Sequence, residues 1–237
     1  MDQITELIAE GKGKRLYATE NPDEAVVYYR DETFAFHGLK RGRIIGKGEI
    51  NNLICEYMFT LLKDKGVPNH FIRRIDNRCS LVKRVEIIPV TVKVRNIVAG
   101  SLAKRIRYPD GTQLKNTVVE HCLKDPELED PLVNLTHITA MGLATPEEIE
   151  IMSHYALRVN EILCECMREI NIELIDFKLE FGKTADGKIV LADEISPDTC
   201  RLWDKTTKEK LDKDRFRRDL GGVEEAYQEI MKRVMGK

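Results

Sequence analysis

The sequence lacks the features that mark membrane proteins and secreted proteins. Its longest stretch without Asp, Glu, Lys or Arg is 131–146, which contains Asn134 and His137 and is too short and too polar for a membrane span. The first residues, 1–6, lack the basic and then apolar order of a secretory signal. We therefore expect a cytoplasmic protein that makes no membrane contact.

Patterns for zinc and for disulfide bonds are also absent. The six cysteines have neither the C-x-x-C spacing of a zinc site nor the density of a disulfide scaffold. The five histidines form no H-x-x-x-H or H-E-x-x-H motif, which leaves a zinc hydrolase without visible ligands. These absences predict reduced cysteines that pack in the core.

Neither sign of charge is in excess, because 38 Lys and Arg residues oppose 40 Asp and Glu residues, a net charge of −2. This balance argues against a protein that coats nucleic acid, and an aromatic content of 6% leaves few rings for stacking on bases. We expect no nucleic-acid partner. The alternative is an RNA-binding module that uses the basic cluster at 95–107, which a strongly salt-dependent RNA affinity without ATP turnover would favour.

What is present suits a globular protein. The 237 residues, 42% of them hydrophobic, suffice for one large domain or two small lobes with a packed core. The first ninety residues alternate strand patterns, at 7–9, 15–19 and 25–29, with turn signals, and indicate a β-rich lobe. One helix is predicted from Ile50 to Leu62, where apolar residues recur every three or four positions.

The middle of the chain predicts a change of architecture. Segment 85–94 is rich in β-branched residues but contains Pro89, which favours an edge strand or a connector and suits a hinge between lobes. Thr145-Pro146-Glu147-Glu148 combines an N-cap, a proline at the first helical position and a capping-box glutamate. We predict a long helix there, then a β-hairpin, a charged loop and a last helix from about Gly222.

The strand predicted after the long helix gives the clearest chemical signal. Alternation places Asp176, Lys178 and Glu180 on one face. With a two-residue turn at 186–187, Glu180 would lie directly opposite Asp193 in a hairpin, whereas a bulged three-residue loop would not pair them. Facing carboxylates destabilise a hairpin unless a cation lies between them, and oxygen ligands suit Mg²⁺. A structural network neutralised by Lys178 is the alternative.

Two further motifs predict the binding of anions. Gly11-Lys12-Gly13-Lys14 would let backbone N–H groups approach a phosphate, although it lacks the Walker A spacing and a basic surface hairpin is the alternative. Arg95, with the hydroxyl of Ser101 and the basic residues that follow it, could hold a phosphate or carboxylate, or could form a solvated helix start. Arg201 and Lys205, which follow the hairpin, are candidates for the same cleft.

Longer motifs, in order along nearly the whole chain, resemble those of the phosphoribosylaminoimidazole-succinocarboxamide synthases, or SAICAR synthases, in their short single-function form. Segment 174–182 fits the family signature L-[IVA]-D-x-K-x-E-F-G, and Ile88-Pro89-Val90 leading to Arg95 fits the other signature. Three more segments resemble family sequence: 193–198, 201–205 and 212–217. One departure is Thr91, where the family usually has a glutamate.

The resemblance implies an α/β (α+β) fold of two lobes with ATP held between them. A β-rich N-terminal lobe similar to that of protein kinases would span 1–88, and a larger mixed lobe would span 89–237. The implied activity is that of a purine-biosynthesis ligase, which converts ATP, L-aspartate and the carboxylate nucleotide CAIR into SAICAR, ADP and phosphate. Mg²⁺ and a homodimer are implied as well. A small-molecule kinase on the same lobed scaffold is the alternative.

The resemblance also implies roles for individual residues. The ATP phosphates would be covered by Lys12, Gly13 and Lys14. The adenine would be bound by the 83–88 stretch, with Lys83 and Glu86. The metal would be held by Glu180 and Asp193. The CAIR cleft would include Arg95, Ser101 and Arg201, with Asp130 and Arg215 as further members. The catalytic group would be Lys178, Asp176 and Asp198, where either aspartate could accept a proton from the amine of the substrate.

Overall fold

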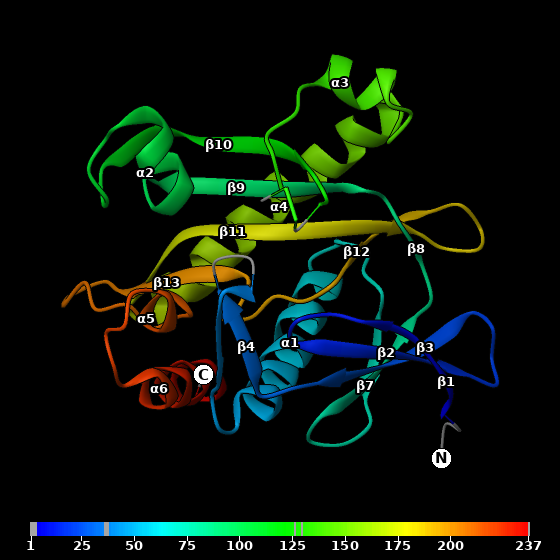
Figure 1. The fold of residues 1–237 in the computed structure, drawn as a ribbon, viewed down its shortest axis with the longest axis horizontal. Coiled ribbons are helices and arrows are strands. Elements are labelled where there is room, and N and C mark those ends of the chain that lie inside the picture. The colour runs from blue at the N-terminus through cyan, green and yellow to red at the C-terminus, as the bar shows by residue number, and fades with distance from the viewer. Residues whose placement is uncertain (1–3, 36–37, 126, 129, 237) are drawn as a thin grey trace.

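The computed structural model describes residues 4–35, 38–125, 127–128 and 130–236. It has the predicted mixed α/β fold, with two main antiparallel sheets. In Figure 1 the sheet built from the first strands lies below the sheet built from the later strands. The N-terminal part is therefore β-rich and contains one long helix, at 47–64, and the other helices come after residue 99.

The lower sheet contains the strands that the turn signals predicted. Its five strands are, in spatial order, β1 (Ile4–Glu10), β2 (Lys14–Thr19), β3 (Glu24–Tyr29), β7 (Cys79–Lys83) and β6 (Phe71–Arg74). A separate pair, β4 (Glu32–Ala35) and β5 (Lys40–Arg43), forms a small two-stranded sheet. The predicted helix is α1 (Lys47–Asp64), which packs against β3 and β6 through its apolar stripe.

The upper sheet has β11 at its centre. Its strands are, in order, β10 (Gln113–Leu123), β9 (Val90–Ile97), β11 (Ile172–Lys183) and β12 (Ile189–Ala192), while β8 (Glu86–Ile87) and β13 (Cys200–Asp204) also pair with β11. The remaining helices are α2 (Gly100–Ile106), α3 (Leu135–Ala140), α4 (Pro146–Glu169), α5 (Asp214–Arg217) and α6 (Val223–Met235). Helix α4 packs against β9 and β11.

The prediction of an edge strand or a connector at 85–94 was wrong for residues 90–94, which form a central strand. Strand β9 lies between β10 and β11 and forms ladders with both. Pro89 lies in the break between β8 and β9, so its missing N–H removes no bond from the β9 ladder. The proline therefore separates two strands, and the β-branched residues after it, such as Val92 and Val94, are fully buried in the sheet interior.

The signals for helix ends were more reliable. Thr145 accepts a hydrogen bond from the backbone N–H of Glu148, whose side chain accepts one from the N–H of Thr145, so the predicted capping box of α4 is confirmed. Helix α6 begins directly after Gly222, as expected. Strand β13 was not predicted, because its sequence CRLWD carries two charges in five residues.

One buried hydrophobic cluster runs through both sheets. It joins Val27 of β3 and Met58 of α1 to Leu179 of β11, Leu163 of α4 and Ile230 of α6. Helices α1 and α6 pack against each other at the lower left of Figure 1, so the last helix lies against the N-terminal part of the chain. Of the helices in the described ranges, none combines the length and apolarity that a membrane crossing requires.

Candidate active site

A cavity of about 980 Å³ gathers most of the predicted site residues. Its wall comes from the β1–β2 loop, from β9 and β11, and from the segments on either side of β13. Twelve residues singled out in the sequence line it: Lys12, Gly13, Lys14, Arg95, Ser101, Asp130, Asp176, Lys178, Glu180, Asp193, Asp198 and Arg201. Residues from both ends of the chain thus face one space.

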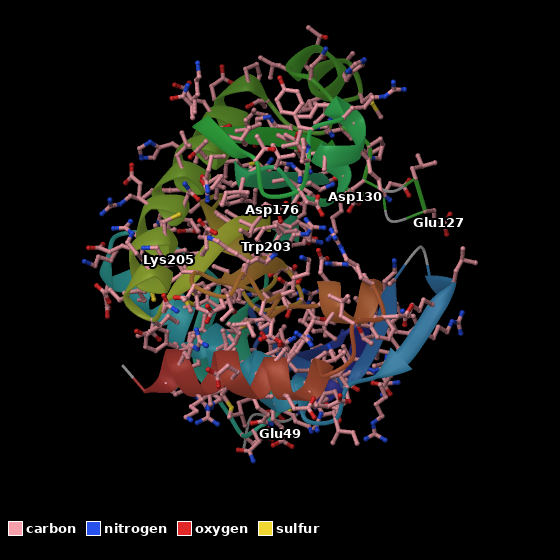
Figure 2. The ribbon with its side chains drawn as sticks, turned by 90° about the vertical axis from the view of Figure 1, so that its left-hand side faces the viewer. Glu49, Glu127, Asp130, Asp176, Trp203 and Lys205 are labelled. Atoms are coloured by element: carbon pink, nitrogen blue, oxygen red, sulfur yellow. The ribbon has the colours of Figure 1, made fainter. Side chains whose placement is uncertain are left out.

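Four candidates lie elsewhere. Lys83 lines a second hollow of about 950 Å³, beside the β11–β12 loop. Glu86 lies opposite Lys183 in the backbone ladder between β8 and β11. Side chains two residues apart on a helix point in nearly opposite directions. Helix α5 therefore presents Arg217 to the cavity, while Arg215 points away from it and donates to the carbonyl of Gly221. Lys205 is exposed, and Figure 2 shows it toward the opposite flank of the molecule from Asp130.

The expected pairing of Glu180 with Asp193 across the hairpin was wrong. Glu180 faces Ala192, because the turn between Thr184 and Lys188 has three residues and Gly187 in the left-handed conformation, φ 79°. Strand β12 ends at Ala192, and Asp193 itself turns away with φ 62°. Glu180 and Asp193 both still line the cavity. The end of β12 before Asp193 therefore brings this carboxylate to the cavity although the register of the hairpin is shifted by one residue.

Lysines surround these two carboxylates. Lys124 and Lys178 contact the two oxygens of Glu180 at 2.6 and 2.9 Å. Lys14 pairs with Asp193. We call this group of Lys14, Lys124, Lys178, Glu180 and Asp193 the lysine end of the cavity. The ion pair of Lys178 with Glu180 is the contact expected from the alternative of a structural network.

Attraction within the lysine end fixes its charges. Burial lowers the pKa of Lys14, but Asp193 and Glu194 outweigh burial and hold that pKa well above its ordinary value. Burial likewise lowers the pKa of Lys178, and Glu180 and Asp193 raise it further than burial lowers it. For Asp193 burial raises the pKa, yet Lys14 and Lys178 hold it well below its usual range. These three groups are therefore charged at neutral pH.

The opposite end of the cavity is built from arginines. Sheet register places Asp176 of β11 between Arg95 of β9 and Arg201 of β13. Arg95 is 2% exposed and donates to Asp176 at 3.0 Å and to Ser101 at 3.0 Å. Its Nε donates to Glu120 at 2.7 Å. We call the group of Arg95, Ser101, Asp176 and Arg201 the arginine end; Figure 2 shows Asp176 within the body of the molecule.

Gly100 allows the arginine end to close tightly. Its φ is +55°, and a Cβ built on it would lie 2.4 Å from Nη2 of Arg201. A side chain at position 100 would therefore strain the backbone and displace the guanidinium. Arg201 is also held by Asp176 at 2.8 Å and by Asp214 at 2.9 Å. Gly100 thus supplies room for the guanidinium, and its neighbour Ser101 supplies a hydroxyl.

Several residues of the cavity network were not predicted. Lys47 is 1% exposed and pairs with Asp198 at 3.0 Å. Lys124, Glu194 and Lys213 also line the cavity. For Lys47 a signal existed, since Gly46-Lys47-Gly48 repeats the alternation of glycine and lysine seen at 11–14. The others have no local signal, because each depends on how distant elements meet. Thr91, the departure from the family signature, is fully buried in β9 and is not among the residues of the cavity wall.

The residues at the lysine end suit a hard divalent cation only if a substrate completes its shell. Glu180 and Asp193 supply carboxylate oxygens, the donors that Mg²⁺ prefers. The described residues hold no group of three or more His, Cys, Asp or Glu arranged to bind a metal alone. Two carboxylates plus phosphate oxygens and water is the usual arrangement for Mg²⁺ with a nucleotide, and the lysines offset the surplus charge.

A cavity with fixed guanidinium groups at one end and lysines around carboxylates at the other is typical of enzymes that act on phosphorylated substrates. The family model described as SAICAR synthetase matches residues 7–234, and the chain belongs to that family. Two phosphoribosylaminoimidazole-succinocarboxamide synthases are each 56% identical to it. The one from Clostridium botulinum (strain Alaska E43 / Type E3) covers 97% of both chains, and the one from Brevibacillus brevis covers 98% of this chain and 97% of the relative.

Solved structures agree with this assignment. The crystal structure of the phosphoribosylaminoimidazole-succinocarboxamide synthase from Ehrlichia chaffeensis has a TM-score of 0.94 at 43% identity, over 97% of this chain and 98% of that chain. A SAICAR synthetase in complex with ADP also has a TM-score of 0.94, at 44% identity over 98% of each chain. The alternative of a small-molecule kinase finds no support among these matches.

Proposed function

We propose that the protein is the ATP-dependent ligase of purine biosynthesis that joins CAIR to L-aspartate and releases SAICAR, ADP and phosphate. The observation that carries this proposal is the match of residues 7–234 to the SAICAR synthetase family, together with a cavity that has two kinds of cationic end. The solved relative in complex with ADP supports binding of ATP by this chain.

The two ends would hold different substrates. The arginine end suits the phosphate of CAIR, because planar guanidinium groups bind phosphate in two-point geometry and Ser101 adds a hydroxyl. The loop of Lys12, Gly13 and Lys14 suits the phosphates of ATP, since its backbone and lysines line the same cavity. The carboxylate of CAIR would then lie between the ends, within reach of Lys178.

Glu180 and Asp193 would hold Mg²⁺. When bound, the ion would offset charge on the phosphates of ATP and on the transferring phosphoryl group. The lysines of this chain complement that effect. Lys178 and Lys14 are charged and fixed by ion pairs before substrate arrives, so little reorganisation is needed as charge develops.

The proposed chemistry activates a poor electrophile. An oxygen of the CAIR carboxylate attacks the γ-phosphorus of ATP, the bond from that phosphorus to the β-bridging oxygen breaks, and ADP leaves. The amine of aspartate then attacks the acyl carbon, the bond from carbon to the phosphate oxygen breaks, and phosphate leaves with that electron pair. The nitrogen of the new amide loses a proton in the same step, and the departing phosphate accepts it.

Neither aspartate proposed as a proton acceptor is well placed for that role. Burial raises the pKa of Asp198, but Lys213, Lys47 and Tyr227 hold it well below its usual range. A carboxylate whose pKa is held this low accepts a proton poorly. Asp176 is instead occupied, because Arg95 and Arg201 donate to its oxygens. We therefore assign to both residues the role of fixed negative charges that orient the surrounding cations.

The test is a reconstituted reaction with purified protein, ATP, Mg²⁺, CAIR and L-aspartate. We expect SAICAR to form in amounts equal to the phosphate released, with no release when aspartate is omitted. Phosphorylated CAIR that accumulates as a final product, with or without aspartate, would instead identify a kinase. A homodimer and a cytoplasmic location stay predictions; light scattering after gel filtration would measure the first.

A further inference from the structure

Asp198 is held from three directions by residues far apart in the sequence. Its Oδ2 accepts a hydrogen bond from Lys47, at the start of α1, at 3.0 Å. Its Oδ1 accepts one at 2.7 Å from the hydroxyl of Tyr227, which is on α6 and fully buried. Lys213, just before α5, lies 3.5 Å from Oδ2. The last helix thus reaches the wall of the cavity through one hydroxyl.

The position of Lys47 is unfavourable unless Asp198 is ionised. Lys47 occupies the first turn of α1, where the helix dipole disfavours a positive charge. It is also 1% exposed, and a buried ammonium is stable only when it is paired. Asp198 supplies that pair, and Tyr227 satisfies the second oxygen of the same carboxylate. The fold therefore fixes the orientation of Asp198 as well as its charge.

Lys213 is held more loosely than four other lysines of the cavity network. Lys14, Lys47, Lys124 and Lys178 each have an ion-pair partner within 3.0 Å. In the described part of the chain, Lys213 has one ion pair, the 3.5 Å contact with Asp198. Burial lowers its pKa further than Asp198 raises it, which agrees with an ammonium that lacks a close partner. An anion in the cavity would supply one.

Asp198 and Lys47 lie against the loop of Lys12, Gly13 and Lys14. A Cβ built on Gly13 would lie 3.4 Å from Nζ of Lys47 and 3.7 Å from Oδ2 of Asp198, so the loop rests on this ion pair. The backbone N–H of Lys213 donates to the carbonyl of Pro197, next to Asp198, at 3.2 Å. Asp198 and Lys213 are therefore linked both by charge and by the backbone.

We propose that Tyr227 is a positioning residue of the active site: it fixes Asp198 from behind, so that Asp198 holds Lys213 toward an anionic group of a bound substrate. That group is a phosphoryl or carboxylate oxygen. This inference rests on the proposed ligase function, because it takes the cavity to be the site of the reaction. Tyr227 touches no substrate itself and acts through the carboxylate.

A double-mutant cycle on steady-state rates tests the inference. The proteins are the wild type, Tyr227→Phe, Lys213→Met and the double variant, each assayed against ATP, CAIR and aspartate in turn. We expect Tyr227→Phe to lower kcat/KM about tenfold in the wild-type background and less than twofold when Lys213 is already methionine. Lys213→Met should raise KM for the substrate that carries the anionic group, which separates a phosphoryl contact of ATP from a carboxylate contact of CAIR or aspartate.

Ile230→Val is the matched control. Ile230 is fully buried on the same helix, so its variant loses packing but keeps the hydroxyl of Tyr227. We expect it to lower the melting temperature and to leave kcat/KM within twofold of the wild type. The inference is overturned if Tyr227→Phe has the same effect in both backgrounds, if Ile230→Val matches its loss of rate, or if Tyr227→Phe stays within twofold of the wild type. A wild-type protein that makes no SAICAR would instead refute the proposed function.

Discussion

The two ends of the cavity use different cations to hold anionic groups. At the arginine end, the guanidinium of Arg95 is 2% exposed and its donors are shared among Glu120, Asp176 and Ser101. At the lysine end, the ammonium groups of Lys124 and Lys178 are paired with the oxygens of Glu180, and the two side chains are about one-third exposed. The first arrangement is rigid and planar, and the second is a set of point charges on flexible stems.

This difference matches what each substrate group must do. A phosphate that only anchors a nucleotide keeps its position and charge, which suits a fixed fork of donors. A phosphoryl group in transfer changes its position and charge distribution, which suits cations that can follow it and carboxylates that can share a metal. If the proposed function holds, we expect affinity to reside mainly at the arginine end and rate mainly at the lysine end. Substitutions at each end can break that division, and they are ordered here from the largest effect to the smallest.

Asp193→Asn should have the largest effect. Asparagine tolerates the left-handed backbone at this position and keeps the shape of the side chain, but it removes the charge that would bind Mg²⁺. We expect kcat to fall by about 10³-fold, measured as phosphate release over a range of Mg²⁺ concentrations. Asp186→Asn, in the β11–β12 loop, is the control with normal rates. A near-normal kcat for Asp193→Asn would leave the lysine end as a structural network.

Arg201→Lys should act on affinity. Lysine keeps the charge but cannot form the planar two-point contacts of a guanidinium. We expect KM for CAIR to rise by about 10²-fold and KM for ATP to change less than twofold, measured in initial-rate assays. Arg218→Lys, at a more exposed arginine on the end of α5, should change neither value. A rise confined to the KM for ATP would move Arg201 to the nucleotide site.

Gly100→Ala tests the same end through its packing. The new Cβ would push against the guanidinium of Arg201, so KM for CAIR should rise by about tenfold while kcat changes little. Gly142→Ala is a matched control, since Gly142 has φ +65° and nothing lies within 4 Å of a Cβ built there. Both variants carry the strain of alanine in a left-handed position, about 1 kcal/mol, and only Gly100→Ala should affect binding. Equal KM values for CAIR in the two variants would contradict the packing argument.

Asp212→Asn should have the smallest effect on catalysis, because it acts on stability alone. Asp212 is fully buried behind the arginine end; burial, with the nearby charge of Asp214, raises its pKa to about 7. An unfolded chain has a pKa of about 4 for this group, so the folded state binds the proton more tightly. The resulting stabilisation is complete below pH 4 and is lost as the pH rises toward 7.

The measurement for Asp212 is urea unfolding of the wild type and the variant between pH 5 and 8. The free energy of unfolding of Asp212→Asn, relative to the wild type, should increase with pH by up to about 1.4 kcal/mol per pH unit and level off above pH 7. Taking this difference removes the contribution of the groups that the two proteins share. A difference that does not change with pH would place the titration elsewhere.

Local patterns predicted much of the frame that carries these residues. Alternation placed Asp176, Lys178 and Glu180 on the cavity side of β11, and all three line the cavity. The capping box of α4 was readable because its bonds join residues three positions apart. The register of the hairpin could not be predicted in the same way. A single extra residue in the turn shifts every pair of facing residues, and only the folded backbone shows that Gly187 and Asp193 are left-handed.

The tertiary part of the site was beyond such patterns. Lys47 and Tyr227 meet Asp198 only because α1 and α6 pack side by side, which no spacing in the sequence encodes. Arg215 was assigned to the cleft from its neighbours in a motif, yet the one-turn helix α5 directs it away from the cavity, to the carbonyl of Gly221, and presents Arg217 to the cavity. Motifs indicate which segments meet, and the local backbone decides which side chain of a segment faces the ligand.

The contact between α1 and α6 also bears on the order in which the molecule can be made. Helix α1 belongs to the early part of the chain, but α6 completes its packing, and one hydrophobic cluster contains residues of both. We expect the N-terminal strands to remain incompletely packed during synthesis until α6 has left the ribosome, and the finished protein to unfold in one cooperative transition. Both sheets contribute residues to the wall of the cavity, and we expect them to fold as one unit.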